Sequence, residues 1–147
     1  MIELLLENAD LRAYSQWDHE IDAPIYAKNR LCMIGDAAHA MTPWQGSGAG
    51  QAFEDVMALK ALLKEVREPG QLNAAFKAYG EVRRPRTQKI VASSRGMGHI
   101  ICRHGPSIGL DPDKILEALA SRWGFIYRID LKEHKKAAVE SFLTSAK

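Results

Sequence analysis

The chain has 147 residues, of which 46% are hydrophobic and 26% are charged, a composition typical of a globular protein large enough to bury a core. Its net charge of +2 indicates no strongly charged partner, so we expect no nucleic-acid binding. No run approaches the ~18–20 apolar residues of a membrane span, and the run Ile2–Leu6 is too short and too acidic for a signal peptide. We therefore expect a cytoplasmic protein without membrane contact.

The segment 11–29 is polar and only weakly periodic. We expect a short strand at Tyr14–Trp17 and a loop over Ile21–Lys28. The next segment, Leu31–Ile34, is a short apolar run that stops at Gly35, and this pattern predicts a buried strand.

A helix is predicted over residues 48–67, because apolar residues recur there at helical spacing before the stop signal Pro69-Gly70. The spacing predicts that one face of this helix belongs to the core. That face comprises Ala52, Phe53, Val56, Leu59, Leu63 and Val66.

The loop between strand and helix is built for close approach of a ligand. Gly46, Gly48 and Gly50 remove side chains from the backbone, and Ser47 is placed to cap the helix. The helix start offers unpaired N–H groups and the positive end of the helix dipole, which suit an anion or an electron-rich ring edge. Asp36 is expected either to accept hydrogen bonds from ligand hydroxyls or to cap a turn. The spacing alone also fits a plain strand-to-helix connection.

The remainder of the chain is predicted to be helical. A second helix is expected over 71–79, and Gly80 and Pro85 predict a break or kink before a third helix over 85–101. Asp111 and Pro112 open a fourth helix.

The last part of the chain contains an aromatic cluster, Trp123–Tyr127, which we interpret as a core patch or a homodimer surface. Residues 130–147 are predicted to form an amphipathic helix. Its expected contacts are Leu131, Ala138, Phe142 and Leu143.

Two cysteines, Cys32 and Cys102, are far apart in the sequence and predict reduced core thiols. His99 and His104 flank Cys102, but they lack an acidic partner and a fourth ligand, so no metal site is expected.

The segment Gly35–His39, followed by Pro43 and by Gly46–Ala52 and Glu54-Asp55, resembles the second FAD-binding motif of the flavoprotein aromatic hydroxylases. Within that family it is most similar to the salicylate hydroxylase-like branch. The resemblance implies an FAD-dependent monooxygenase that uses NAD(P)H and molecular oxygen to hydroxylate a small aromatic, salicylate-like substrate.

By this resemblance, Asp36 would bind the ribityl hydroxyls of FAD. The loop Pro43–Gly48 would pass beside the isoalloxazine ring, and the following helix start would face the flavin N1 and C2 carbonyl. Negative charge gathers there when the flavin is reduced, and a helix N-terminus stabilises such charge. The implied cofactor-binding residues are Gly35, Asp36, Pro43, Gln45, Gly46, Ser47 and Gly48.

The implied fold is α/β: the C-terminal portion of an FAD-binding Rossmann-like hydroxylase fold, mainly helical here, with a short strand leading into the flavin-binding loop. Residues 1–29 would be a remnant of the substrate-binding sheet and connector, 30–68 the FAD-binding strand-loop-helix, and 69–147 a C-terminal helical region. No G-x-G-x-x-G occurs to hold the pyrophosphate, so we expect a fragment. The alternative is an inactive flavin-motif remnant that acts as a helical interaction module.

No catalytic residue is assigned, because the group that activates the phenol would lie upstream. We expect His39 to be a structural hydrogen-bonding histidine. Trp44 would shield the flavin ring, line the substrate side, or pack beneath the loop.

Arg83, Arg84 and Arg86 belong to an Arg-Arg-Pro-Arg sequence. The resemblance places a similar sequence in the helical region behind the flavin. We predict that one of these arginines pairs with Glu54 or Asp55.

Overall fold

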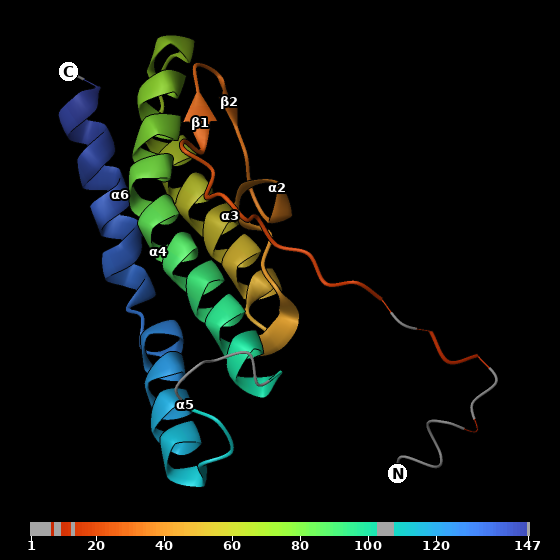
Figure 1. Ribbon diagram of the computed structural model, residues 1–147. Coiled ribbons are helices and arrows are strands. Elements are labelled where there is room, and N and C mark those ends of the chain that lie inside the picture. Colours follow the sequence, from red (N-terminus) through yellow and green to blue (C-terminus); the bar gives the residue numbers. More distant parts are fainter. Residues whose placement is uncertain (1–6, 8–9, 13, 103–107, 147) are drawn as a thin grey trace.

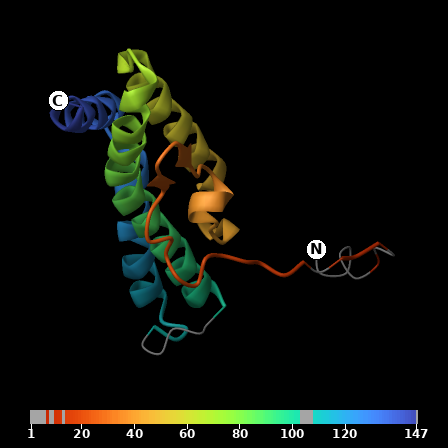
Figure 2. The ribbon, with the colours of Figure 1, turned by 90° about the horizontal axis from the view of Figure 1, so that it is seen from above.

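The structure is a computed structural model that describes residues 7, 10–12, 14–102 and 108–146. Three long helices, α3, α4 and α6, pack against one another, and the expected mainly helical character is confirmed (Figure 1). A small hairpin and the loop that follows it lie on one side of α4, and α6 lies on the other (Figures 1 and 2). The elements are β1 (Ala27–Lys28), β2 (Leu31–Cys32), α2 (Asp36–His39), η1 (Pro43–Gln45), α3 (Gly48–Glu65), η2 (Pro69–Gln71), α4 (Leu72–Ile101), α5 (Pro112–Tyr127) and α6 (Leu131–Ser145).

The sheet of the described residues consists of β1 and β2, which pair antiparallel with Ala27 opposite Cys32. The prediction of a strand at Tyr14–Trp17 is wrong, because these residues have no regular structure, and the expected loop over Ile21–Lys28 ends in β1. The predicted buried strand is shorter than expected, and its Leu31 side chain is 78% exposed. The hairpin packs against α4 through β1, and Leu31 of β2 remains exposed to solvent.

The orientation predicted for α3 is wrong at three of the expected core positions. Phe53 is 73% exposed, Val56 51% and Leu63 44%. The helix instead turns a mainly polar face toward α4, because charged and amide groups on that face have partners on α4. The residues of α3 that are buried are Gln51, Glu54, Asp55, Ala58 and Leu62.

The break expected at Gly80 and Pro85 is absent, since α4 runs as one helix of 30 residues from Leu72 to Ile101. Pro85 has no N–H to donate to the preceding turn, which costs a helix interior about 3 kcal/mol. Buried residues on both sides of the proline, Tyr79 and Ile90 among them, hold the helix against its neighbours. Tertiary burial therefore outweighs the local preference of the proline.

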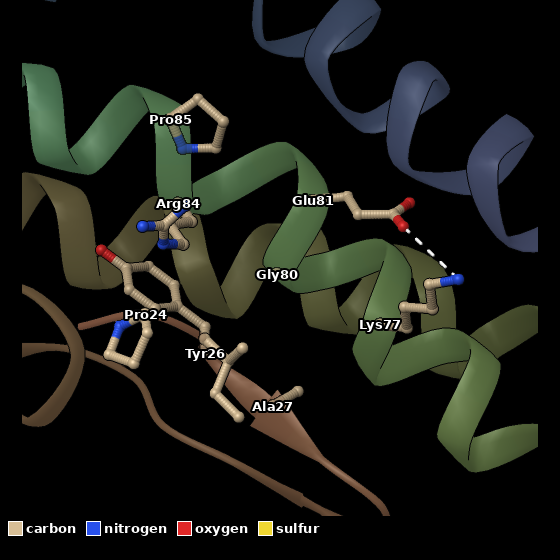
Figure 3. A pocket seen from close by; sticks show the side chains of 9 residues that line it. Pro24, Tyr26, Ala27, Lys77, Gly80, Glu81, Arg84 and Pro85 are labelled. Atoms are coloured by element: carbon tan, nitrogen blue, oxygen red, sulfur yellow. Dashed lines mark ion pairs between the residues drawn. The ribbon is translucent and has the colours of Figure 1, made fainter. Parts of the chain in front are cut away.

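An open pocket of about 370 Å³ lies between β1 and α4 (Figure 3). Tyr26 lies next to Gly80 of α4, where an added Cβ would be in ordinary van der Waals contact with the Tyr26 Cβ, at 3.7 Å. Lys77 and Glu81 form an ion pair of 3.8 Å at its border, and Pro85 also lines it. None of the predicted cofactor-binding residues lines this pocket.

The two C-terminal helices begin as predicted. Asp111 accepts hydrogen bonds from the backbone N–H groups of Asp113 and Lys114, and Asp130 caps α6 in the same way. Within α6, Ala138 and Phe142 are buried, as expected. The other two expected contacts of α6 are more open: Leu131 is 37% and Leu143 50% exposed.

The aromatic cluster lies at the end of α5. Trp123 and Tyr127 stack with ring centroids 5.7 Å apart, but Tyr127 is 71% exposed. Of the five residues in the cluster, Ile126 is buried. The cluster thus contributes little to the core, and its role as a homodimer surface stays a prediction.

The described residues contain no helix that is both long and apolar enough to cross a membrane. Nor do three His, Cys, Asp or Glu side chains of residues 7, 10–12, 14–102 and 108–146 converge as metal ligands; His104 lies outside these residues. Both cysteines are free thiols. The prediction of core thiols is wrong for Cys102, which is exposed, whereas Cys32 is half-buried and packs against the core cluster.

Candidate functional site

The turn that follows β2 requires glycine. Gly35 has φ 57° and ψ −142°, a conformation that residues with a Cβ rarely adopt, and its N–H donates to Asp55 Oδ2 at 3.0 Å. Helix α2 starts at the next residue, Asp36, whose side chain is exposed and makes no hydrogen bond to any described residue. The carboxylate of Asp36 is therefore a free acceptor at the start of this turn.

The loop after α2 is fixed to α4 and α5. Two hydrogen bonds join Thr42 and Ser94: Ser94 Oγ donates to the Thr42 carbonyl at 2.6 Å, and Thr42 Oγ1 donates to Ser94 Oγ at 3.2 Å. Gln45 is 2% exposed, and its amide nitrogen donates to the Arg122 carbonyl at 3.0 Å. Gly46 closes η1 in the left-handed conformation, with φ 60°.

Trp44 packs against α4, and a Cβ at Gly98 would overlap its indole ring. Of the three interpretations of Trp44, packing beneath the loop agrees with this contact. Close packing here requires glycine at position 98.

Ser47 stands at the N-cap position of α3, but its side chain does not cap the helix as predicted. Its hydroxyl donates to the Gln45 carbonyl at 3.0 Å instead. The first turn of α3 therefore has no side-chain cap. A Cβ added at Gly46 or Gly50 would meet nothing within 4 Å, so the backbone on both sides of the helix start faces open space.

Behind the loop lies a buried ionic network centred on Arg83, which is fully buried. Its Nε donates to Asp55 Oδ1 at 2.8 Å, its Nη1 donates to Glu54, and its Nη2 donates to the Gln51 side-chain oxygen at 2.9 Å. Arg86 adds two hydrogen bonds to Glu54, at 2.7 and 2.8 Å. The predicted pairing of this arginine cluster with Glu54 or Asp55 is confirmed.

Asp55 is the carboxylate on which the turn depends. Its Oδ2 lies 2.6 Å from His39 Nε2, and both side chains are fully buried. Burial alone would raise the pKa of Asp55, but hydrogen bonds from His39, Gly35 and Arg83 outweigh it and hold the pKa below its usual value. The expected structural, hydrogen-bonding role of His39 is confirmed.

Glu54 stays ionised for a similar reason. Burial raises the pKa of its carboxyl, and the hydrogen bonds and charges of Arg86 and Arg83 lower it by more, so the net direction is downward. The third arginine of the cluster, Arg84, lies outside the network and donates to the Ala23 carbonyl at 2.8 Å.

Sequence reasoning missed the contribution of α6 to this network. His134 Nε2 lies 3.2 Å from Arg83 Nη1. No local pattern marks His134, because its partner is 51 positions away in the sequence. Burial lowers the pKa of His134, the positive charges of Arg83 and Arg86 lower it further, and Glu54 opposes this.

The lowered pKa of His134 predicts a stability that depends on pH. The unfolded chain takes up the imidazole proton below about pH 6.5, whereas the folded chain resists it. The contribution of His134 to stability should be complete above that pH and should decline as the pH falls from about 6.5 toward the lower folded-state pKa.

Urea unfolding followed by circular dichroism between about pH 7.5 and 5.5 measures this effect above the range in which carboxylates titrate. The matched variant is His134→Gln, whose side-chain oxygen can accept from Arg83 but does not titrate. We expect a steeper loss of stability in the parent protein than in the variant. Equal pH dependence in both would contradict the prediction.

Together, these groups leave one part of the loop region available to a ligand. The free carboxylate of Asp36 accepts hydrogen bonds from hydroxyls, and the uncapped start of α3 attracts negative charge. The described charged groups behind the loop, Asp55, Glu54 and Arg83, are already paired. The arrangement can bind a polyhydroxylated, partly anionic ligand, and its paired charges serve to position the loop.

Residues 6–94 match the family model for an FAD binding domain. The chain is 38% identical over 120 residues to 6-methylsalicylate 1-monooxygenase atA of Aspergillus terreus, which covers 82% of this chain and 27% of that protein. It is 38% identical over 111 residues to a salicylate hydroxylase of Pseudomonas putida, with 75% and 26% covered. The chain therefore spans about a quarter of the length of these curated relatives.

A solved structure, a salicylate hydroxylase substrate complex, matches with a TM-score of 0.76 and 37% identity over 80% of this chain and 29% of that chain. Sequence and structure comparisons thus agree, and they confirm the resemblance inferred from the Gly35–Asp55 segment. The chain belongs to the FAD binding domain family and, within it, is similar to the monooxygenases of salicylate hydroxylase type.

Proposed function

We propose that this chain supplies the ribityl- and ring-binding part of the FAD site in an NAD(P)H-dependent monooxygenase that hydroxylates a small aromatic, salicylate-like substrate with molecular oxygen. The observation that carries the proposal is the free carboxylate of Asp36 on a glycine-dependent turn, followed in the chain by the uncapped start of α3. FAD supplies the redox chemistry when bound.

The residues present fit such a cofactor. Asp36 would accept hydrogen bonds from the ribityl hydroxyls, because its carboxylate is exposed and unpaired among the described residues. The open space at Gly46 and Gly50 leaves room for a ring against the backbone. The start of α3 would stabilise charge on a reduced flavin by about 0.3–1 kcal/mol.

Two further residues of the loop would act through their backbone. The side chains of Gln45 and Ser47 are buried and engaged inside the protein, so their main-chain atoms are what a ring would meet. Gly35, Pro43 and Gly48 complete the proposed set. Within this proposal, residues 1–29, 30–68 and 69–147 keep the assignments predicted from the sequence, and a cytoplasmic homodimer is the proposed assembly.

The test is a titration of the chain with FAD, followed by flavin fluorescence and by the thermal unfolding transition. Low-micromolar binding, worth roughly 8 kcal/mol, is expected for the parent chain. Asp36→Ala should weaken binding about tenfold or more, because a charged acceptor is lost, while the unfolding temperature stays the same. The control is Asp22→Ala, which removes an exposed carboxylate outside the loop. Unchanged affinity in Asp36→Ala, or no saturable binding by the parent chain, would refute the proposal.

A further inference from the structure

Arg83 is fully buried, yet it is linked to both segments that form the proposed FAD site: through Asp55 to the Gly35–Asp36 turn, and directly to Gln51 in the first turn of α3. We propose that Arg83 is a positioning residue that fixes the Gly35–Asp36 turn relative to the first turn of α3. The inference rests on the proposed function, since it concerns the same site.

The first contact runs through Asp55 to the turn. Arg83 Nε holds Oδ1 of Asp55, and Oδ2 of the same carboxylate binds the Gly35 N–H and His39 Nε2. Gly35 immediately precedes α2, and His39 is its last residue. One carboxylate therefore holds both ends of α2, and Arg83 sets the orientation of that carboxylate.

The second contact runs to the start of α3. Arg83 Nη2 donates to the backbone carbonyl of Gln51 at 3.1 Å and to its side-chain oxygen at 2.9 Å. The Gln51 N–H in turn donates to the Ser47 carbonyl at 3.0 Å and closes the first turn of α3. Arg83 thus holds the first turn of α3 through Gln51.

The geometry requires a guanidinium group. Its donors point in fixed directions within one plane, which allows Asp55, Glu54 and Gln51 to be bound at once. A lysine ammonium could keep the charge but could not span the same acceptors. Charge balance is met, because Arg83 and Arg86 face Glu54 and Asp55.

The experiment compares Arg83→Lys with the matched control Arg84→Lys, the same change one position along α4 at an arginine outside the network. Amide hydrogen exchange is measured on the cofactor-free chain for peptides covering residues 33–40 and 47–52, with α4 peptides covering residues 89–100, which exclude the substituted positions, as the internal reference. FAD affinity is measured in parallel by fluorescence titration.

We expect Arg83→Lys to speed exchange in 33–40 and 47–52 about tenfold relative to the α4 reference and to weaken FAD binding by a similar factor. Arg84→Lys should change neither. A uniform change in exchange over the whole chain, or an equal effect of both variants, would overturn the inference. If the parent chain does not bind FAD, the proposed function fails, while the exchange data still decide the role of Arg83.

A second variant covers the case in which Arg83→Lys does not fold. Asp55→Asn keeps an oxygen to accept from Arg83 but replaces the acceptor of the Gly35 N–H by an amide nitrogen. It should speed exchange in 33–40 selectively. Unchanged protection of 33–40 in Asp55→Asn would also overturn the inference.

Discussion

Replacing Asp55 by alanine is expected to lower the free energy of unfolding by about 3–5 kcal/mol, the usual loss when one partner of a buried ion pair is removed. The positive charge of Arg83 would remain buried, and its remaining carboxylate partner, Glu54, is also paired with Arg86. The Gly35 N–H would also lose its acceptor. Because small domains have only about 5–15 kcal/mol of stability, this variant should be close to unfolding.

The measurement is urea denaturation followed by circular dichroism at neutral pH. Asp36→Ala is the matched control, since it removes a carboxylate that is exposed and makes no hydrogen bond to a described residue, and its stability should stay within about 0.5 kcal/mol of the parent. A loss of less than about 1 kcal/mol for Asp55→Ala would show that the network contributes little to stability.

Phe142→Ala is expected to cost about 3–5 kcal/mol, because it leaves a cavity where α6 meets the core. Phe142 is 1% exposed and belongs to the main apolar cluster together with Leu62 of α3 and Tyr79 of α4. Removing its ring takes away the largest buried apolar side chain that α6 contributes.

The control for this variant is the next residue in the chain. Leu143→Ala removes a side chain that is 50% exposed and should cost clearly less than Phe142→Ala. Urea denaturation measures both variants under the same conditions. Equal losses for the two would mean that α6 does not dock through Phe142.

The helices of this chain could largely be predicted from the sequence, but the orientation of α3 could not. Its apolar spacing identified the helix correctly, yet Phe53 and Val56 point outward while Glu54 and Asp55 are buried. A periodicity rule treats charged residues as surface residues. It fails where two arginines of another helix supply buried partners, because those partners are about 30 positions away.

Local rules failed at two other positions for a related reason. Pro85 predicted a helix break, but tertiary packing on both sides of the proline keeps α4 continuous. Ser47 was predicted to cap α3, but its hydroxyl donates to the Gln45 carbonyl instead. The parts predicted well depend on short-range geometry or on a long specific motif. The start of α5 at Asp111 and Pro112 is of the first kind, and the family resemblance of the Gly35–Asp55 segment is of the second.

The conformation of Gly35 has a consequence at the level of the genetic code. Every glycine codon begins with two guanines. Each amino acid that a single-base missense change of such a codon can encode carries a Cβ. At φ 57° and ψ −142° each of them would be strained, at a cost of about 1–3 kcal/mol. No one-base missense mutation therefore preserves this backbone without strain, and the codon for Gly35 has no conservative neighbour.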